Sequence, residues 1–455
     1  MSTIFSIGQS ALSAAQVGVN TAGNNIANVS TPGYSRQQVV QTVAPSGQGT
    51  QVAEVQRVYS DYLGKQLVSS QSANSQLQTQ YSQIQPIDQL LSDSTTAGLG
   101  PALQNFFDGL QDLAAAPADP VARQAVLANA EALSAGFNDL SGRLEEVGQS
   151  LNQQISSSVE QVNNAAQRLA ELNQAILSST NLNDGKPANE LVDQRNQLVS
   201  DLSQQIKVTA SERGGQFNLF IGNGQPLVLG SKPYSLQAVA SKTDPRRTEA
   251  AYGDGTPMKA DDFAGGALGG LLEFREQTLV PTQNALGRIA MGLASGMNAQ
   301  HREGITLGNQ AGGDFFSLPD TSTEATAAGA IRLAITDVKD IAAAAKGSAV
   351  GDNSNLLKMI DLQSAKVLDG NTRSYQSAYV QLVGQVGSKT RELEVTSTAS
   401  KQIQAQAERS LQGVAGVNLD EEAANLIRYQ QSYQAAGKVI QLAKQLFDTV
   451  LSISN

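Results

Sequence analysis

The chain opens on a helical pattern of small and apolar residues. Between about residues 3 and 27 these residues recur every three to four positions, which is the spacing of one stripe along an α-helix. The members of the stripe are Ile4, Ile7, Ala11, Ala14, Gly18, Ala22, Asn25 and Val29. Because several of them are small, we expect a neighbouring backbone to approach this helix closely.

The first helix also lacks the charged face of an ordinary surface helix. Arg36 is the first charged residue of the chain, and the next is Glu54. Asn, Gln, Ser and Thr fill the positions between the apolar ones, so both faces of the helix are suited to being covered. Its few large apolar side chains bury too little surface to offset the conformational entropy of ordering about 25 residues. We therefore expect the segment to become ordered only against a partner.

The last helix carries a heptad seam, in which one set of residues lies seven apart and a second set follows each by three. The two sets are Leu426, Tyr433, Ile440 and Phe447, and Tyr429, Ala436, Ala443 and Val450. Asn418 or Asp420 can cap the start of this helix. Glu421 and Glu422 suit the positive end of its dipole. Both ends of the chain thus carry seam-bearing helices, which are expected to pair with each other or with a second copy.

Helices account for most of the chain between these ends, and strands are confined to the middle. Helical spacing runs over residues 62–92, 119–179, 188–205, 268–302 and 352–411. Residues 206–239 instead alternate apolar and polar positions between Gly-rich turns, which indicates strands and hairpins. Residues 329–337 have the pattern of another strand. The sequence therefore predicts a mainly α fold with a β-rich insert.

This order of elements predicts a discontinuous multidomain fold, in which the chain runs out through nested domains and returns with both termini together. An inner domain of coiled-coil terminal helices is expected to comprise residues 1–60 and 406–455. A helical-bundle domain is expected from residues 61–205, 264–312 and 349–405, and an outer β-rich domain from residues 206–263 and 313–348.

Composition and charge exclude several classes of function. The net charge of −10 is opposite to what nucleic-acid binding requires, and no polybasic run marks an anionic membrane surface. Cysteine is absent, so disulfides, thiolate nucleophiles and Cys-ligated metals are excluded. No stretch reaches the ~18–20 unbroken apolar residues of a membrane span. The N-terminus lacks the basic region and continuous apolar core of a signal peptide, so we expect no cleaved leader.

No set of residues forms a recognisable catalytic, cofactor-binding or metal site. His301 is the only histidine, so an acid–base pair of histidines or a histidine metal site has no second member. The glycine-rich residues 266–270 lack the Gly-Lys-Ser/Thr of a phosphate-binding loop, and residues 387–390 carry these residue types in the wrong order. We therefore expect no enzyme activity, no cofactor and no metal. An enzyme that uses His301 and Asp314 remains a minor alternative.

Two terminal stretches resemble the rod, hook and junction proteins of the bacterial flagellum. They are SALSAAQVGVNTAGNNIANVSTPGYSRQ at residues 10–37 and GVNLDEEAANLIRYQQSYQAAGKVIQLAKQLFDTVL at residues 416–451. Within that superfamily the chain is most similar to the family of the first hook–filament junction protein. This likeness rests on NVSTPGYSRQ in the first stretch and on the internal runs ELVDQRNQLVSDLS, GGLLEFREQTL, LASGMNAQHREG and GGDFF.

The resemblance implies a structural subunit that polymerises after the hook and adapts it to the filament. It implies an extracellular place at the hook–filament junction, reached through the flagellum's own type III export apparatus without a cleaved leader. The implied partners are further copies of the chain in a helical assembly, the hook protein, hook-associated protein 3, and an export chaperone that binds the C-terminal helix. The outer insert is short for this family, so an outermost domain is expected to be missing.

The expected assembly interface therefore lies on the two terminal helices and on the turn after the first of them. Its expected members are Ile4, Ile7, Ala11, Ala14, Gly18, Ala22, Asn25, Asn28 and Arg36, followed by Leu426, Tyr429, Tyr433, Ala436, Ile440, Ala443, Phe447 and Val450. Another rod or hook subunit, or a cytosolic coiled-coil scaffold, remains the alternative interpretation.

Overall fold

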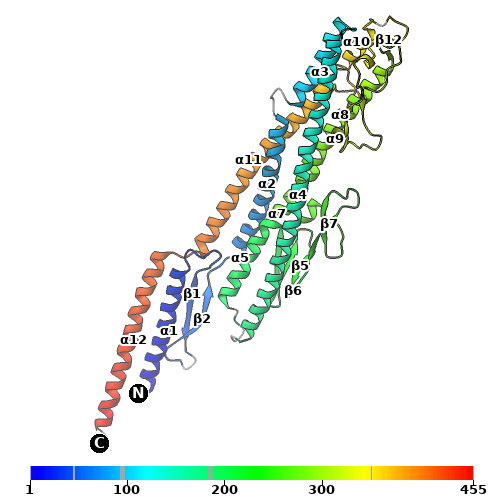
Figure 1. The fold of residues 1–455 in the computed structure, drawn as a ribbon. Coiled ribbons are helices and arrows are strands. Elements are labelled where there is room, and N and C mark those ends of the chain that lie inside the picture. The colour runs from blue at the N-terminus through cyan, green and yellow to red at the C-terminus, as the bar shows by residue number, and fades with distance from the viewer. Residues whose placement is uncertain are drawn as a thin grey trace.

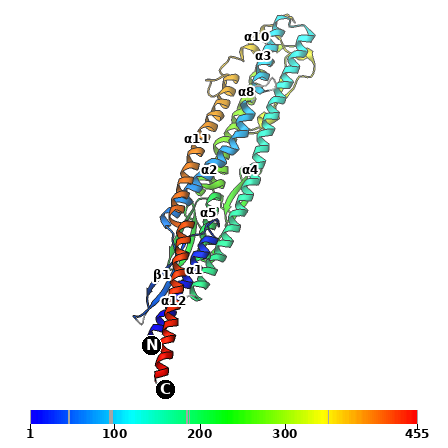
Figure 2. The same ribbon diagram turned by 90° about the vertical axis from the view of Figure 1, so that its left-hand side faces the viewer.

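The two ends of the chain lie side by side at one extremity of a long molecule (Figures 1 and 2). We describe residues 2–44, 47–92, 98–182, 186, 188–349 and 351–453 of a computed structural model. Helix α1 (Ser2–Ala27) packs on α12 (Leu419–Ile453), and this pair forms one end of the molecule. The expected return of the chain, with both termini together, is confirmed.

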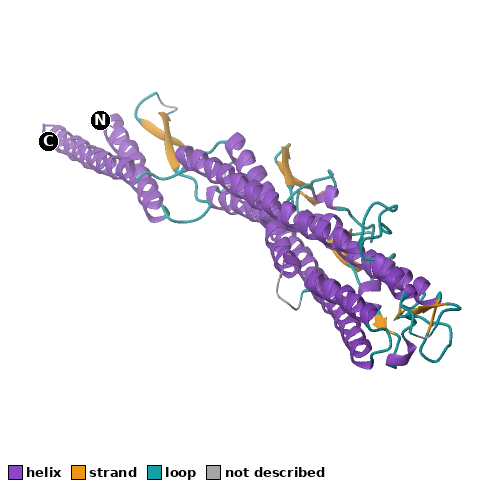
Figure 3. Ribbon diagram, turned by 90° about the horizontal axis from the view of Figure 1, so that it is seen from above, coloured by secondary structure: helices purple, strands orange, loops and turns teal. Residues whose placement is uncertain are grey.

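Long helices connect this end to the other. They are α2 (Asp61–Ser92), α4 (Pro120–Leu182), α8 (Val280–Arg302) and α11 (Tyr375–Ala415), with the shorter α3 (Leu99–Ala115), α5 (Asn189–Gln205), α7 (Gly266–Phe274) and α10 (Ser354–Asp361) packed beside them. Seen from above, helices form nearly all of the length, and strands occur in small groups at its sides (Figure 3). The predicted mainly α fold is thus confirmed.

Most predicted helices agree with the structure to within a few residues, and three regions differ. The sequence analysis missed α3 entirely. The helix predicted over residues 268–302 contains a π-helical turn, η1 (Arg275–Leu279), between α7 and α8. The helix predicted over residues 352–411 is two helices, α10 and α11, separated by a loop in which Asp369, Gly370 and Asn371 all have positive φ. Three successive left-handed residues cannot continue an α-helix, which explains the break.

The strands of the described chain are antiparallel and fall into five small sheets. A hairpin of β1 (Gln37–Val43) and β2 (Thr50–Arg57) follows α1 and packs against it. A four-stranded meander contains β3 (Val208–Arg213), β4 (Gln216–Ile221), β5 (Pro226–Leu229) and β6 (Lys232–Pro233), and a hairpin of β7 (Leu236–Ala240) and β8 (Thr248–Tyr252) comes after it. Two-residue strands pair β9 (Gly304–Ile305) with β12 (Ala344–Ala345), and β10 (Phe316–Ser317) with β11 (Arg332–Leu333).

The expected outer β-rich domain separates into two regions at different levels of α4. Asn163 of α4 exchanges two hydrogen bonds with the backbone of Leu236, at 2.8 and 2.9 Å. Much nearer the start of α4, Asn138 donates to Ala328 O at 2.9 Å. Residues 206–263 and 313–348 also share no sheet among the described strands. The strand expected at residues 329–337 is reduced to β11, because α9 (Ala327–Ala330) occupies its start. The other domain boundaries stay a prediction.

The far end of the molecule has an aromatic core that α3 supplies. Phe106 of α3 lies 5.3 Å from Phe107 and 5.7 Å from both Phe315 and Phe316, measured between ring centroids. All four side chains are fully buried. Offset and edge-to-face aromatic contacts of this kind add to the free energy gained by burial. The missed helix α3 is therefore a central part of the core.

Midway along α2, amide side chains and a glycine contact add to the apolar packing of α7. Gln76 and Gln80 of α2 both donate to Glu273 Oε2 of α7 at 2.6 Å. A Cβ added to Gly270 of α7 would lie 2.6 Å from the carbonyl oxygen of Gln76, so only glycine allows this close approach. The glycine-rich residues 266–270 thus form the first half of α7 and allow its close packing on α2.

His301 is a buried packing residue in the last turn of α8. Its Nδ1 lies 2.8 Å from Gly313 O, and its Nε2 accepts a hydrogen bond from Ala342 N at 2.9 Å. Both ring nitrogens are therefore occupied. Asp314 instead pairs with Arg302. The arrangement contains no acid–base pair of His301 and Asp314.

No described helix is long and apolar enough to cross a bilayer. Within the same described ranges, no three His, Asp or Glu side chains gather in a way that could hold a metal ion.

The burial of His301 predicts a stability that falls in mild acid. Burial lowers the pKa of His301 from its ordinary value of 6.5, although Asp314 and Asp340 favour the charged ring. The neutral ring therefore contributes stability above pH 6.5, and this contribution is lost as the pH falls from 6.5 through the lower folded-state pKa. Thermal unfolding between pH 7.5 and 5 should show a steeper loss for the wild type than for His301→Gln. Equal pH dependence of the unfolding temperature in the two proteins would contradict the burial of a neutral His301 ring.

Candidate assembly interface

The two terminal helices run antiparallel and touch through glycines of α1. A Cβ added to Gly8 would lie 2.7 Å from Cγ1 of Ile440, and one added to Gly18 would lie 2.4 Å from Cδ1 of Tyr429. Real Cβ atoms do not come so close to other atoms, so these side chains of α12 occupy the space that a larger residue would need. The expected close approach to the first helix is confirmed, and its partner is the other end of the same chain.

Small residues also form the buried part of this contact. On α1 the side chains of Ala14, Ala15 and Ala22 are buried, and on α12 those of Ala436 and Ala443 are. The two buried alanines of α12 lie seven apart, as the heptad seam requires. Ile7, Ala11, Leu426, Tyr429 and Ile440 are half-buried around them.

The start of α12 is capped as the sequence predicted. Asn418 Oδ1 accepts hydrogen bonds from the backbone N–H groups of Asp420 at 3.0 Å and Glu421 at 3.3 Å. Asn418, and not Asp420, is therefore the N-cap. This cap fixes the residue at which the chain turns from α11 into α12.

Several predicted interface residues are open to solvent in the single chain. Tyr433 is 41% exposed, Phe447 and Val450 are each 51% exposed, and Ile4 is 40% exposed. Figure 1 shows the C-terminal end of α12 extending beyond the N-terminal end of α1. These residues fit the expectation of an interface that a second chain covers.

Helix α12 also has a second apolar stripe that the heptad analysis missed. Leu442 follows Val439 by three residues, and Leu446 follows Leu442 by four. This spacing places the three side chains on one side of the helix. Leu442 is 55% exposed, and the other two are 37% and 43% exposed. Exposed apolar side chains that gather on one helix face mark a contact surface more often than chance does. The spacing alone could have revealed this stripe.

Asn25 and Asn28 are used inside the chain, contrary to the expectation that they contact another subunit. Asn25 is fully buried and donates to Gln37 O at 2.8 Å. Its Oδ1 accepts from Gln37 N at 2.9 Å and from Tyr34 OH at 2.8 Å. Asn28 donates to Asn24 O and accepts from Thr31 Oγ1 at 3.1 Å. The two amides therefore hold the turn after α1 in its shape.

Arg36 likewise connects two parts of the same chain. Its Nη1 lies 2.6 Å from Glu421 Oε1 at the start of α12, and its backbone N–H donates to Ala415 O at the end of α11. The expected polar contact of Arg36 is thus intramolecular. It ties the turn after α1 to the α11–α12 junction.

A buried ion pair joins the inner end of the molecule to α5. Arg57 of β2 pairs with Asp193 of α5, and both side chains are largely buried. Asp193 also accepts a hydrogen bond from Ser35 N at 3.2 Å. Burial beside Asp193 and Glu190 raises the pKa of Tyr34 to about 12, so its hydroxyl stays protonated and can donate to Asn25. We call the contacts of residues 28–36, Arg57 and Asp193 the joint.

Two open clefts flank the joint. One has a volume of about 820 Å³ and lies between the turn and helices α4 and α5. The other has a volume of about 810 Å³ and lies between the turn, α2, α5 and the end of α11. Residues Thr31, Pro32 and Tyr34 line both. The turn at residues 28–36 therefore lies between two clefts and is held to the rest of the chain mainly by polar contacts.

Comparison with known families explains this architecture. The model of the flagellar hook-associated protein FlgK helical domain matches residues 84–316, which is more than half of the chain. A flagella basal body rod protein model matches residues 5–34, and a model of the flagellar basal body rod FlgEFG protein C-terminal region matches residues 413–453. Flagellar hook-associated protein 1 of Escherichia coli (strain K12) is 34% identical over 549 residues, with 100% of both chains covered.

The chain belongs to the flagellar hook-associated protein 1 family. It is a structural subunit of the bacterial flagellum at the hook–filament junction, as the terminal motifs predicted. The family member of Bacillus subtilis (strain 168) is 28% identical, and 97% of this chain and 96% of that protein are covered. The two rod-type models match only the terminal helices, so they do not favour the alternative of a rod or hook subunit.

A solved structure and the length of the relatives agree with this assignment. The flagellar hook junction protein FlgK of Burkholderia pseudomallei has the same fold, with a TM-score of 0.70 at 22% identity, over 77% of this chain and 100% of that one. The alignment with the Escherichia coli relative is 549 residues long and this chain has 455, so at least 94 positions of that hook-associated protein face a gap.

The glycine contact between α1 and α12 can be tested with two alanines in the same helix. Gly18→Ala forces the ring of Tyr429 out of its place, whereas Gly23→Ala meets no atom within 4 Å. Hydrogen exchange in α1 and α12 should become faster in Gly18→Ala. Exchange in Gly23→Ala should stay the same or become slower, because alanine is a better helix former by about 1 kcal/mol. Equal behaviour of the two variants would show that the helices do not meet at Gly18.

The joint offers a comparison between a buried and an exposed ion pair. Asp193→Asn leaves the guanidinium of Arg57 buried without its partner, which destabilises by about 3–5 kcal/mol. Glu421→Gln removes the partner of Arg36 at a site where the carboxylate is 54% exposed, and should change stability by about 1 kcal/mol or less. Urea unfolding followed by circular dichroism measures both. A larger loss for Glu421→Gln would reverse the roles assigned to the two pairs.

Proposed function

We propose that the chain builds the hook–filament junction by packing its α1–α12 pair against the same pair in neighbouring copies. The open stripe of α12 carries this proposal, because Val439, Leu442 and Leu446 are exposed although they form one apolar side of a helix. A contact of α12 with a different surface of the next copy is heterologous. Repeated heterologous contacts whose rotation does not close generate a helical assembly. In that assembly the α1–α12 pairs form the inner wall.

The family resemblance supplies the proposed neighbours of this assembly. We place the hook protein on one side of the junction and hook-associated protein 3 on the other. Before export, a cytoplasmic chaperone covers α12, whose apolar stripe would otherwise be exposed. The proposed route is the flagellum's own type III apparatus, without a cleaved leader, and the place of the assembled protein is outside the cell.

The joint suits an adaptor between a flexible hook and a stiff filament. When the interface between two parts of one chain is small and polar, the two parts are expected to move relative to each other. The turn at residues 28–36 lies between two clefts and is held by Arg57–Asp193 and Arg36–Glu421. We propose that the inner helices tilt about this joint, so that the inner wall follows one neighbour while the outer helices follow the other.

A strain that lacks the chain provides the direct test. It should complete its hooks, fail to grow filaments and release unassembled flagellin into the medium, and the wild-type chain should restore filaments. Electron microscopy of isolated hooks and immunoblotting of the medium measure these outcomes. Filaments of normal number in the deletion strain would exclude a role at the junction.

The open stripe can be tested separately with neighbouring residues of α12. Leu442→Asp places a charge on the exposed apolar side, and Gln441→Asp places the same charge on the adjacent exposed polar residue. Because neither side chain packs inside the monomer, circular dichroism should be unchanged in both. Leu442→Asp should abolish incorporation onto isolated hooks and motility on soft agar, while Gln441→Asp should keep both. Normal motility of Leu442→Asp would remove the stripe from the interface.

A further inference from the structure

Three arginine side chains are buried in the described part of the chain, and one of them, Arg275, has neither a carboxylate partner nor a set of carbonyl acceptors around its guanidinium. Arg123 donates to the carbonyl oxygens of Pro117, Val338 and Ile341 at 2.7–2.9 Å. Arg195 lies 3.5 Å from a carboxylate oxygen of Glu212. Arg275, at the start of η1, is only 8% exposed and has no carboxylate within 4 Å among the described residues. Buried charges are normally paired, so Arg275 needs an explanation.

Most of the guanidinium of Arg275 is without a hydrogen-bond acceptor. Its Nη1 donates to Thr248 O at 2.5 Å, and no acceptor for Nε or Nη2 is found among the described residues. Neither nitrogen atom is fully enclosed by protein, so both remain accessible to solvent. Burial lowers the pKa of Arg275, and the charges of Glu249 and Glu276 oppose this effect. The group therefore presents two nitrogen atoms without an acceptor and a charge without a directly paired carboxylate among the described residues.

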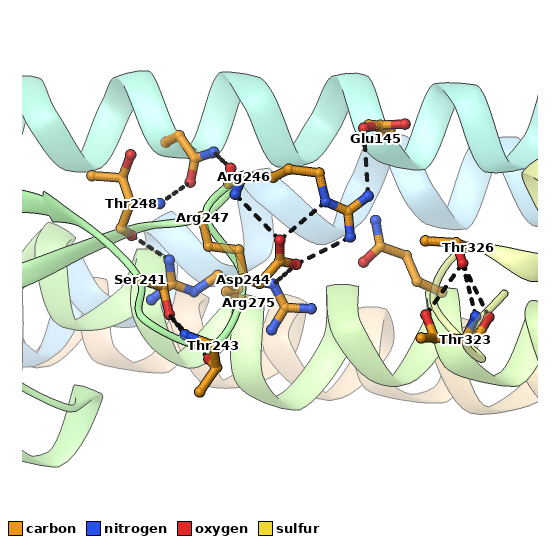
Figure 4. A network of polar contacts seen from close by, with 12 residues as sticks. Glu145, Ser241, Thr243, Asp244, Arg246, Arg247, Thr248, Arg275, Thr323 and Thr326 are labelled. Atoms are coloured by element: carbon orange, nitrogen blue, oxygen red, sulfur yellow. Dashed lines mark hydrogen bonds and ion pairs between the residues drawn. The ribbon is translucent and has the colours of Figure 1, made fainter. Parts of the chain in front are cut away.

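The space beside Arg275 is a cavity of about 290 Å³ between α4, the loop before β8 and the start of α8. Arg246 and Arg247 of that loop line it together with Glu145 of α4. Figure 4 shows Arg246 lying between Asp244 and Glu145, and Arg275 reaching Thr248. One water takes about 30 Å³ of liquid, so the cavity has room for a small ion and several waters.

Asp244 cannot serve as the missing counter-charge. Arg246 Nε donates to its Oδ1 at 3.0 Å, and Arg246 Nη2 donates to its Oδ2 at 3.1 Å. Arg247 Nε lies 3.1 Å from the same Oδ2. Two arginines thus share this one carboxylate, and no acceptor for the Nη groups of Arg247, which also lines the cavity, is found among the described residues.

We propose that this cavity is an oxyanion site, in which the guanidinium groups of Arg275 and Arg247 hold a carboxylate or a phosphate. Guanidinium donors are planar and match two oxygens of such anions at once. The loop that carries Arg247 is fixed in advance, since Asn152 of α4 donates to Arg246 O at 2.7 Å and accepts from Thr248 N at 2.9 Å. The site therefore pays little ordering entropy when an anion enters.

Two sources of the anion share this chemistry. One is a free ion, represented by inorganic phosphate. The other is an acidic side chain of a neighbouring copy, which rests on the proposed assembly and which a chain with 41 Asp and Glu residues can readily supply. The two sources differ in whether the isolated monomer responds to phosphate.

The first experiment follows thermal unfolding of the full chain in sodium phosphate and in sodium chloride of the same ionic strength. A free-ion site predicts an unfolding temperature that rises with the logarithm of the phosphate concentration. Arg275→Gln should weaken the apparent phosphate affinity about tenfold or more, because it removes a charged donor. Arg143→Gln is the matched control, since Arg143 lies on α4 near Glu145 but is exposed and does not line the cavity. Equal phosphate effects in wild type, Arg275→Gln and Arg143→Gln would indicate an adventitious ion only and would overturn a free-ion site.

The second experiment measures incorporation of the same variants onto isolated hooks. A carboxylate from a neighbour predicts no phosphate response in the monomer, and loss of incorporation in Arg275→Gln but not in Arg143→Gln. Arg247→Gln, which changes a partly exposed side chain, repeats both measurements in case Arg275→Gln does not fold. If phosphate has no specific effect and both cavity variants assemble like Arg143→Gln, the proposal is wrong. The deletion strain tests the junction role independently of this site.

Discussion

The architecture depends on the contact between α1 and α12. Helix α1 has almost no charge and few large side chains, so it cannot form a stable domain alone, and the seam of α12 gives it a surface with room for close approach. Gly8 and Gly18 make that approach possible, because any Cβ there would collide with Ile440 or Tyr429. Since the two helices come from opposite ends of the chain, everything between them must run outward and return. The nested order of the other elements follows from this one constraint.

Packing changes in character along the molecule. At the far end, α3 brings Phe106 and Phe107 into a dry aromatic core. Toward the joint, contacts between helices use amides, hydroxyls and glycine, as in the pair of glutamines on Glu273. Polar contacts that exchange readily with water surround the region where the inner helices attach.

The repetitive parts of the fold were predictable from the sequence, and the parts set by tertiary contacts were not. The long helix α4 and the capped seam of α12 have period and cap signals within the chain itself. Helix α3 was missed although its buried residues Leu103, Phe106, Leu110 and Leu113 recur every three to four positions, so its period was also present in the sequence. In the candidate interface, the partners of two polar residues within the chain were not predicted. Asn25 and Arg36 were expected to contact another subunit, and both are bound within the chain, because a polar side chain does not indicate whose backbone it will meet.

The antiparallel pairing of α1 with α12 has a consequence for timing. A ribosome makes α1 first and α12 last, and a chain that leaves the cell from one end releases the two helices at the beginning and the end of its passage. Until the last residues arrive, Gly18 has no Tyr429 to meet and α1 has no partner. The α1–α12 pair is therefore complete only when the whole chain is present, and a chain broken anywhere before α12 lacks the surface through which we propose that copies join.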